Sequence, residues 1–119
     1  MRIDGLSTIA TRFDGMLIDQ FGVIHDGQEL YPGTLRVLTE LKALGVPVAV
    51  MTNSGKRAAA NVERLTRMGV PRDCFVDAVS SGEVAYHMIG KKKVFVIGKA
   101  QEDYGFDGIP VVGNVAQAD

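Results

Sequence analysis

"MLIDQFGVIHDG", residues 16–27, joins a short apolar run to a long glycine-punctuated loop, and the acid Asp19 closes the run. An apolar run of this length, bounded by turn residues, is typical of a buried strand, so we expect a strand over residues 15–19. A second run, residues 46–51, is rich in β-branched residues and leads into the sequence TNSG at 52–55. This pattern predicts another strand that also ends in polar residues.

Apolar residues at helical spacing alternate with these strands. Residues 32–44 open with Pro32, residues 58–68 carry a second apolar stripe, and a glycine follows each run; both patterns predict helices. Oppositely charged residues stand one helical turn apart on the polar sides of these helices: Arg36 with Glu40, and Glu63 with Arg67.

The second half of the chain continues the alternation. Ser80 and Glu83 have the spacing of a capping box, which predicts a helix that runs to about Ile89. Residues 93–98, "KVFVIG", have the composition of a further strand. Strands that alternate with helices in βαβα order indicate an α/β fold with a parallel sheet and right-handed crossovers.

Composition excludes several classes of partner. The 119 residues are 46% apolar and 23% charged, which is typical of a globular chain. A formal net charge of -1 argues against nucleic acid or an anionic membrane as the main partner. No apolar stretch approaches the ~20 residues of a membrane span. The single cysteine, Cys74, favours a reducing, cytoplasmic location, and the sequence leaves a homo-oligomer open.

The polar ends of the two strands suggest a binding site. In open α/β sheets, ligands bind beyond the carboxyl ends of the strands. Thr52, Asn53 and Ser54 offer hydroxyls, an amide and backbone N–H groups just before a helix, which suits an anion such as phosphate. Asp19 would repel that anion unless the carboxylate attacks phosphorus or holds a divalent cation. The loop 20–31 is long for such a connection and is a candidate lid or substrate loop.

Each of these signals also has an ordinary structural explanation. An acid at a strand end is often a cap or turn residue, and TNSG is a common helix-capping sequence. A Walker-type phosphate loop is excluded because Lys56 is followed by Arg57. A phosphoacceptor receiver domain would need an acidic pair after its first strand, and Asp4 and Asp14 are not placed that way. A non-catalytic binding module is the stronger alternative.

The stretches "MLIDQFGVIHDG", "YPGTLRVLTELKALGVPVAVMTNSGKR" and "RLTRMGV" resemble the first half of the haloacid dehalogenase-like superfamily. They are most similar to its subclass IIA, the phosphoglycolate, pyridoxal-phosphate and nucleotide phosphatase-like group with a large α/β cap. The resemblance covers residues 13–97. It implies a Rossmann-like core and Mg²⁺-dependent hydrolysis of small phosphorylated metabolites.

The resemblance also implies a role for each site residue. Asp19 would attack phosphorus to form an aspartyl-phosphate, which water then hydrolyses. Thr52 would hydrogen-bond the phosphoryl oxygens, together with the backbone N–H groups around Gln20, Phe21 and Asn53. Mg²⁺ would bind the Asp19 carboxylate and the main-chain carbonyl of Phe21.

The sequence departs from the family pattern at Phe21, where the family has an aspartate that acts as general acid and then as base. Phe21 can do neither, although its carbonyl still serves the metal. This change predicts slow release, a good leaving group or an acid from elsewhere. His25 is a candidate acid, although a lone loop histidine is more often a surface residue; His87, in a helical stretch, is expected to be structural.

The end of the chain is the second departure. The family needs a later basic residue and an acidic pair after another strand. Residues 91–107 supply neither in convincing form, because Lys99 stands where the first acid should and Asp103 and Asp107 come late. We therefore expect residues 1–90 to be the N-terminal part of a core and residues 91–119 to begin an incomplete cap. Such a chain would be part of a longer hydrolase or a truncated relative, with little activity in isolation.

Overall fold

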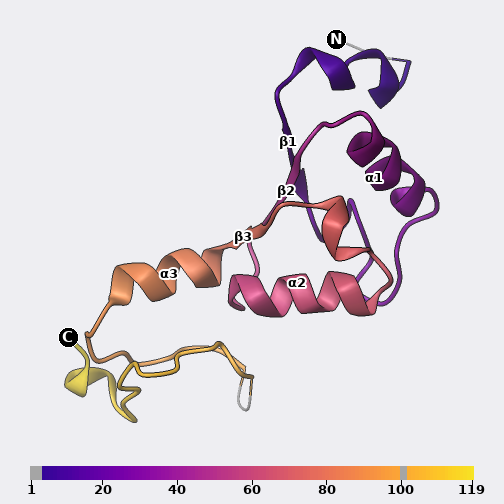
Figure 1. Ribbon diagram of the computed structural model, residues 1–119. Helices are drawn as coiled ribbons and strands as arrows, with labels where there is room; N and C mark the ends of the chain where they lie inside the picture. Colours follow the sequence, from indigo (N-terminus) through magenta and orange to yellow (C-terminus); the bar gives the residue numbers. More distant parts are fainter. Residues whose placement is uncertain (1–3, 100–101) are drawn as a thin grey trace.

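The computed structural model describes residues 4–99 and 102–119. In these residues β1 (Met16–Asp19), β2 (Val48–Thr52) and β3 (Ala78–Ser80) form a parallel sheet in the order β1-β2-β3. The α/β class and the parallel Rossmann-like sheet predicted from the sequence are confirmed (Figure 1).

The helices lie where the apolar stripes predicted them. They are α1 (Thr34–Ala43), α2 (Ala58–Arg67) and α3 (Ser81–Ile89), with short 3-10 turns at Leu6–Thr8, Ala10–Arg12, Arg72–Cys74 and Val115–Gln117. Pro32 is not in the first turn of α1 as predicted. Gly33 has a φ of 87°, which lies in the left-handed region and delays the start of the helix to Thr34. The two predicted ion pairs form, at 4.0 Å for Arg36–Glu40 and 2.6 Å for Glu63–Arg67.

The helices α1 and α2 cover one face of the sheet (Figure 1). The helix α1 connects β1 to β2, and α2 connects β2 to β3, so both connections step across the sheet in the same direction. Right-handed crossovers that step in one direction place their helices on the same face. Alternate residues of the strands point to this side and form the core with the two helices. Val48, Val50, Leu38 and Leu65 are all nearly inaccessible to solvent.

The opposite face of the sheet is apolar and open. Register places Asp19, Met51 and Val79 side by side on this face, with Leu17 two residues earlier in β1. Leu17 is 70% exposed and Met51 is 52% exposed. Parallel sheets are ordinarily covered on both faces, and here these side chains form an exposed apolar surface on one of them.

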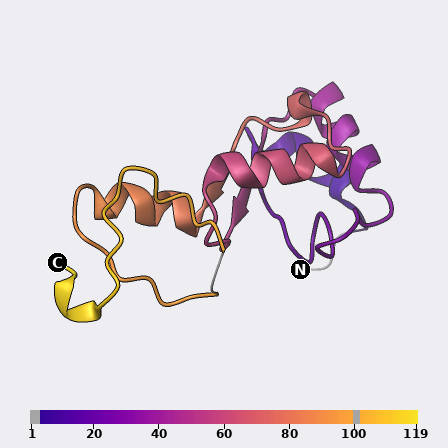
Figure 2. The same cartoon turned by 90° about the horizontal axis from the view of Figure 1, so that it is seen from below.

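The chain after β3 leaves the sheet and forms an elongated second lobe. In Figure 2, α3 and the segment that follows it extend away from the sheet and the other two helices. The radius of gyration is 17.4 Å, whereas a compact chain of this length would have a value of about 13.5 Å. The proposed division into residues 1–90 and 91–119 remains a prediction.

The strand predicted over residues 93–98 is wrong. Only Val94 pairs there, in an isolated bridge with Val111. Pro110 precedes that partner and has no N–H to extend the ladder, and Ile97 is 90% exposed because no layer packs against it. Conversely β3, which the sequence reading did not assign, forms at residues 78–80 beside β2.

Among the described residues, no helix has the length and apolar character required to cross a membrane.

Candidate functional site

The sheet brings Asp19 and Thr52 to one edge. Asp19 is the last residue of β1 and lies opposite Met51, so Thr52 follows directly at the end of β2. Asp19, Thr52 and Asn53 line the same open cavity, together with Met51 and Ser81. Ser81 follows β3 and was not identified from the sequence; its position could have been found only by recognising the short strand before it.

The threonine and the residues after it form a tight turn. Thr52 is 8% exposed, and its Oγ1 accepts a hydrogen bond of 3.3 Å from the Ser54 N–H. The Ser54 Oγ in turn accepts from the Lys56 N–H at 3.2 Å. The Thr52 hydroxyl donates to no acceptor among the described residues, so its proton is available to a ligand in the cavity. Ser54 itself does not line this cavity.

The Asp19 carboxylate is exposed and held by its own loop. Its Oδ1 accepts from the Gln20 N–H at 2.7 Å, a contact that orients the carboxylate. Phosphate binding by this N–H stays a prediction. The other oxygen, Oδ2, accepts no hydrogen bond within the described residues. This arrangement gives a carboxylate of fixed orientation with one oxygen directed to solvent or ligand.

The residues present supply part of a magnesium site. A carboxylate and a main-chain carbonyl are hard oxygen donors, which Mg²⁺ prefers. Asp19 offers the first, and the Phe21 carbonyl, which accepts no hydrogen bond from the described residues, offers the second. The described part of the chain contains no cluster of three or more acidic, histidine or cysteine ligands. The donor type therefore fits Mg²⁺, but the set is incomplete within these residues.

The loop 20–31 is folded against the protein and does not project as a free flap. Gln20, Ile24 and His25 are buried, while short bridges join Phe21 to His25 and His25 to Leu30. Phe21 is 64% exposed. Its ring meets the His25 ring edge-on, with 6.1 Å between centroids.

His25 is not the surface residue that its loop position suggested. It is 1% exposed, and its Nδ1 accepts from the Gly27 N–H at 2.9 Å, which places the proton of the neutral ring on Nε2. That buried Nε2 has no partner among the described residues. Burial, and secondarily the charge of Arg64, lowers the pKa of His25 from its ordinary value of 6.5. A neutral histidine is a poor general acid, so the structure does not favour His25 as a replacement for the missing aspartate.

The first turn of α3 packs against the turn that follows Thr52. The capping box forms only in part: Ser80 Oγ accepts from the Glu83 N–H at 3.1 Å, but the Glu83 carboxylate binds Arg57 and the Ala58 N–H. These contacts, led by the Arg57 hydrogen bonds, lower the pKa of Glu83 from 4.5 to about 2. The sequence reading missed this pair because its members lie 26 residues apart, and no local pattern links them.

Comparison with known proteins identifies the family. A family model described as haloacid dehalogenase-like hydrolase matches residues 16–107, which is most of the chain. The chain belongs to the haloacid dehalogenase-like hydrolases. The match begins at the first residue of β1 and includes the cavity-lining residues of all three strand ends.

Solved structures resemble this chain in fold. A haloacid dehalogenase-like hydrolase from Brucella suis 1330 superposes with a TM-score of 0.84 at 27% identity, covering 99% of this chain and 46% of the other. A hypothetical protein from Pyrococcus horikoshii OT3 has a TM-score of 0.58 at 24% identity, covering 84% and 41%, and supports the fold alone. The chain thus spans about half the length of these proteins. No curated protein matches it.

Gly82 tests how tightly α3 packs on the turn in this haloacid dehalogenase-like chain. A Cβ at Gly82 would collide with the Gly55 carbonyl and lie 2.7 Å from the Lys56 oxygen. In an ordinary helix Gly→Ala is favourable by about 1 kcal/mol. Here overpacking costs about 1–3 kcal/mol, so we expect Gly82→Ala to lower the free energy of unfolding in urea.

Gly113→Ala is the matched control, because its Cβ would meet nothing within 4 Å and should change stability by less than about 0.5 kcal/mol. A stabilised Gly82→Ala variant would show that the turn and α3 are not in close contact.

The buried His25 predicts a pH dependence of stability. Because its folded pKa lies below 6.5, the fold favours the neutral ring. The free energy of unfolding should be greatest above pH 6.5 and fall as the pH drops through the lowered value. The variant His25→Asn retains an acceptor for the Gly27 N–H but does not titrate. We expect it to remove this dependence in urea titrations at pH 5–7.5, and an unchanged slope in the variant would contradict the assignment.

Proposed function

We propose that this chain carries the nucleophile-bearing part of a Mg²⁺-dependent phosphatase that hydrolyses small phosphorylated metabolites, of the subclass IIA type. One observation carries the proposal: an exposed carboxylate and a buried hydroxyl, Asp19 and Thr52, stand at the ends of adjacent parallel strands and line one cavity. An acid and an anion-binding turn at one edge suit phosphoryl transfer to the acid. They suit simple anion binding poorly, because like charges repel.

The proposed reaction has two displacements at phosphorus. The free Oδ2 of Asp19 attacks, an oxygen–phosphorus bond forms, and the bond to the leaving group breaks. This gives an aspartyl-phosphate and an alkoxide or phenolate, which takes any proton it needs from water. Water then attacks the phosphorus and loses a proton to solvent, and the bond between the Asp19 oxygen and phosphorus breaks, which releases inorganic phosphate and restores the carboxylate. The Gln20 N–H at 2.7 Å holds the carboxylate in orientation, and the Thr52 hydroxyl donates to a phosphoryl oxygen in both steps.

Magnesium would be held by the Asp19 carboxylate and the Phe21 carbonyl. When bound, it would offset the repulsion between carboxylate and phosphate and stabilise the charge that develops on the phosphoryl oxygens. We propose that the remaining ligands and the balancing basic residue come from polypeptide outside this chain. The related Brucella suis structure, of which this chain covers 46%, is long enough to hold such a second part.

Phe21 limits the substrates we propose. Without a carboxylic acid at this position, the leaving group departs without a proton from the loop. Such a site works best on leaving groups that are stable as anions. Because the Phe21 ring is 64% exposed near the nucleophile, we propose that it instead offers an apolar contact to the substrate.

A non-catalytic phosphate-binding module is the second candidate. The same Phe21 favours it, together with the absence of a complete ligand cluster among residues 4–99 and 102–119. In this case the Thr52 turn would bind phosphate and Asp19 would serve only the cation.

The two candidates differ in the effect of Asp19→Asn. With p-nitrophenyl phosphate, whose leaving group needs no proton, we expect slow release of p-nitrophenolate that requires Mg²⁺. We expect Asp19→Asn to reduce it by at least about a thousandfold. Thr52→Val should reduce it by about ten- to a hundredfold, the worth of one hydrogen bond to a charged group.

Asp14→Asn is the control, since this exposed acid precedes β1 and should not affect the rate. Release that persists in Asp19→Asn would contradict the phosphatase. Phosphate binding without any release, with or without Mg²⁺, would favour the binding module.

A further inference from the structure

We propose that Arg57 and Glu83 are positioning residues for the phosphate-binding turn 52–57, and that they make its shape depend on the docking of the segment 102–108. The inference rests on the function proposed above. Neither residue lines the cavity that holds Asp19 and Thr52, so their action would be through the turn.

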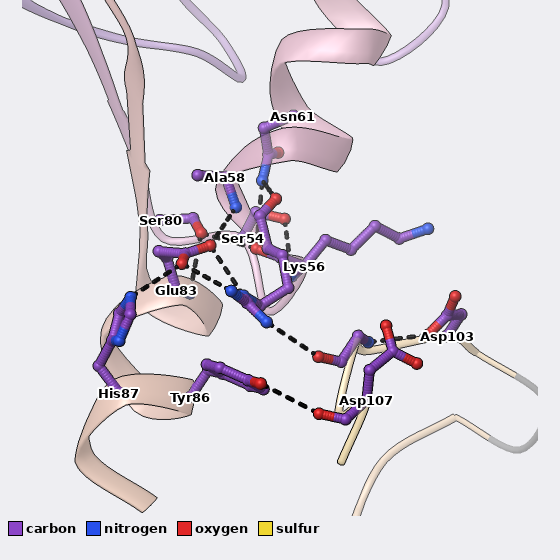
Figure 3. Close-up of polar contacts among 12 residues, drawn as sticks. Ser54, Lys56, Ala58, Asn61, Ser80, Glu83, Tyr86, His87, Asp103 and Asp107 are labelled. Carbon is purple, nitrogen blue, oxygen red and sulfur yellow. Dashed lines mark hydrogen bonds and ion pairs between the residues drawn. The ribbon is translucent and has the colours of Figure 1, made fainter. Parts of the chain in front are cut away.

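The pair has the geometry of a strong ionic contact. Arg57 Nε donates to Glu83 Oε2 and Arg57 NH2 donates to Glu83 Oε1, both at 2.8 Å (Figure 3). The two side chains are only 26% and 22% exposed. The pair Glu63–Arg67 on the same protein surface is 71% and 72% exposed. Fork-shaped, half-buried pairs fix geometry, whereas exposed pairs contribute little.

The pair lies among contacts that tie the turn to α3 and to the start of α2. Glu83 also accepts from the Ala58 N–H at 2.9 Å, which fixes the start of α2 against α3. Beside it, the Gly82 N–H donates to the Ser54 carbonyl at 3.0 Å, and the Ser80 hydroxyl donates to the Lys56 carbonyl at 2.6 Å.

A further donor completes this arrangement. The Asn61 amide donates to the carbonyls of Lys56 and Arg57 at 3.2 and 2.9 Å. All three carbonyls thus have protein donors.

An anion site needs donors rather than carbonyl oxygens at its surface. The N–H groups of Ser54, Lys56 and Ala58 are engaged within the protein. The occupied carbonyls therefore leave the Thr52 hydroxyl and the remaining N–H groups of the turn to the phosphate.

The same arginine contacts the segment that follows α3. Its guanidinium lies 3.5 Å from the centroid of the Tyr86 ring and donates to the Gly105 carbonyl at 3.3 Å. The Tyr86 hydroxyl donates to the Asp107 carbonyl at 3.0 Å, as Figure 3 shows. Gly105 itself has a φ of 68° and lies so close to Arg57 that a Cβ would meet the Arg57 side chain at 2.5 Å.

These contacts argue for positioning and against direct phosphate binding by Arg57. Its charge is already neutralised by Glu83, which stays ionised through the physiological range because its pKa is about 2. Movement of the segment 102–108 removes a hydrogen bond and a packing surface from Arg57. The Arg57–Glu83 contact, and with it the turn, would then lose part of its support.

Arg57→Lys tests the proposal in the whole chain, because lysine keeps the charge but cannot form the two parallel hydrogen bonds. Calorimetric titration with inorganic phosphate in Mg²⁺ should show about ten- to a hundredfold weaker binding than in the wild type. Amide hydrogen exchange at Gly82, whose N–H binds the turn, should be at least about tenfold faster. Arg67→Lys makes the same change in the exposed pair on α2 and should alter neither measurement.

Tyr86→Phe is the second variant and decides the matter if Arg57→Lys does not fold. It removes only the hydrogen bond to Asp107, and we expect phosphate binding to weaken in the same direction by a few-fold. Unchanged phosphate affinity in the folded variant would overturn the inference and leave the proposed function intact. Equal weakening in Arg67→Lys would overturn it as well. Absence of phosphate binding in the wild type would instead remove the proposed function, and this inference with it.

Discussion

The parallel pairing of β1 with β2 is the constraint on which the site depends. Its register sets Asp19, the last residue of β1, opposite Met51. Thr52 follows Met51 at the end of β2, so Asp19 and Thr52 lie at the same edge of the sheet. A slip of one residue would turn Asp19 to the other face of the sheet, where α1 and α2 pack. Every second residue of β2 is buried, and Val48, Val50 and Thr52 are directed to the core. A shift by one residue would expose these side chains to solvent, so their burial holds the register.

The edge alone does not make an anion site. The turn after Thr52 must present N–H groups, and its carbonyls must be occupied elsewhere. The donors are Gly82 in the first turn of α3, Ser80 at the end of β3 and Asn61 in α2. The helix α3 extends from the sheet into the second lobe. The helix therefore both supports the turn and leads into the segment 102–108. One element thus links the geometry of the site to the second lobe.

Local patterns predicted most of the fold, while contacts distant in the chain did not follow from them. The apolar stripes of α1 and α2 and the runs of β1 and β2 are local, and all four lie close to the predicted positions. Asp19, Thr52 and Asn53 were predictable because strand ends in a parallel sheet share an edge. The Arg57–Glu83 pair, the burial of His25 and the failure of residues 93–98 to form a strand depend on tertiary partners. No spacing in the sequence reports such partners.

The central claim is that Asp19 accepts a phosphoryl group, and chemical trapping measures this directly. The chain would be incubated with p-nitrophenyl phosphate and Mg²⁺ and quenched in acid. Borohydride would then reduce the acyl phosphate to an alcohol, and the site would be located by peptide mass mapping. The account predicts reduction at Asp19 and at no other carboxylate. Reduction at another acid, or a phosphoryl group that resists borohydride and maps to the neighbouring Ser81, would contradict it.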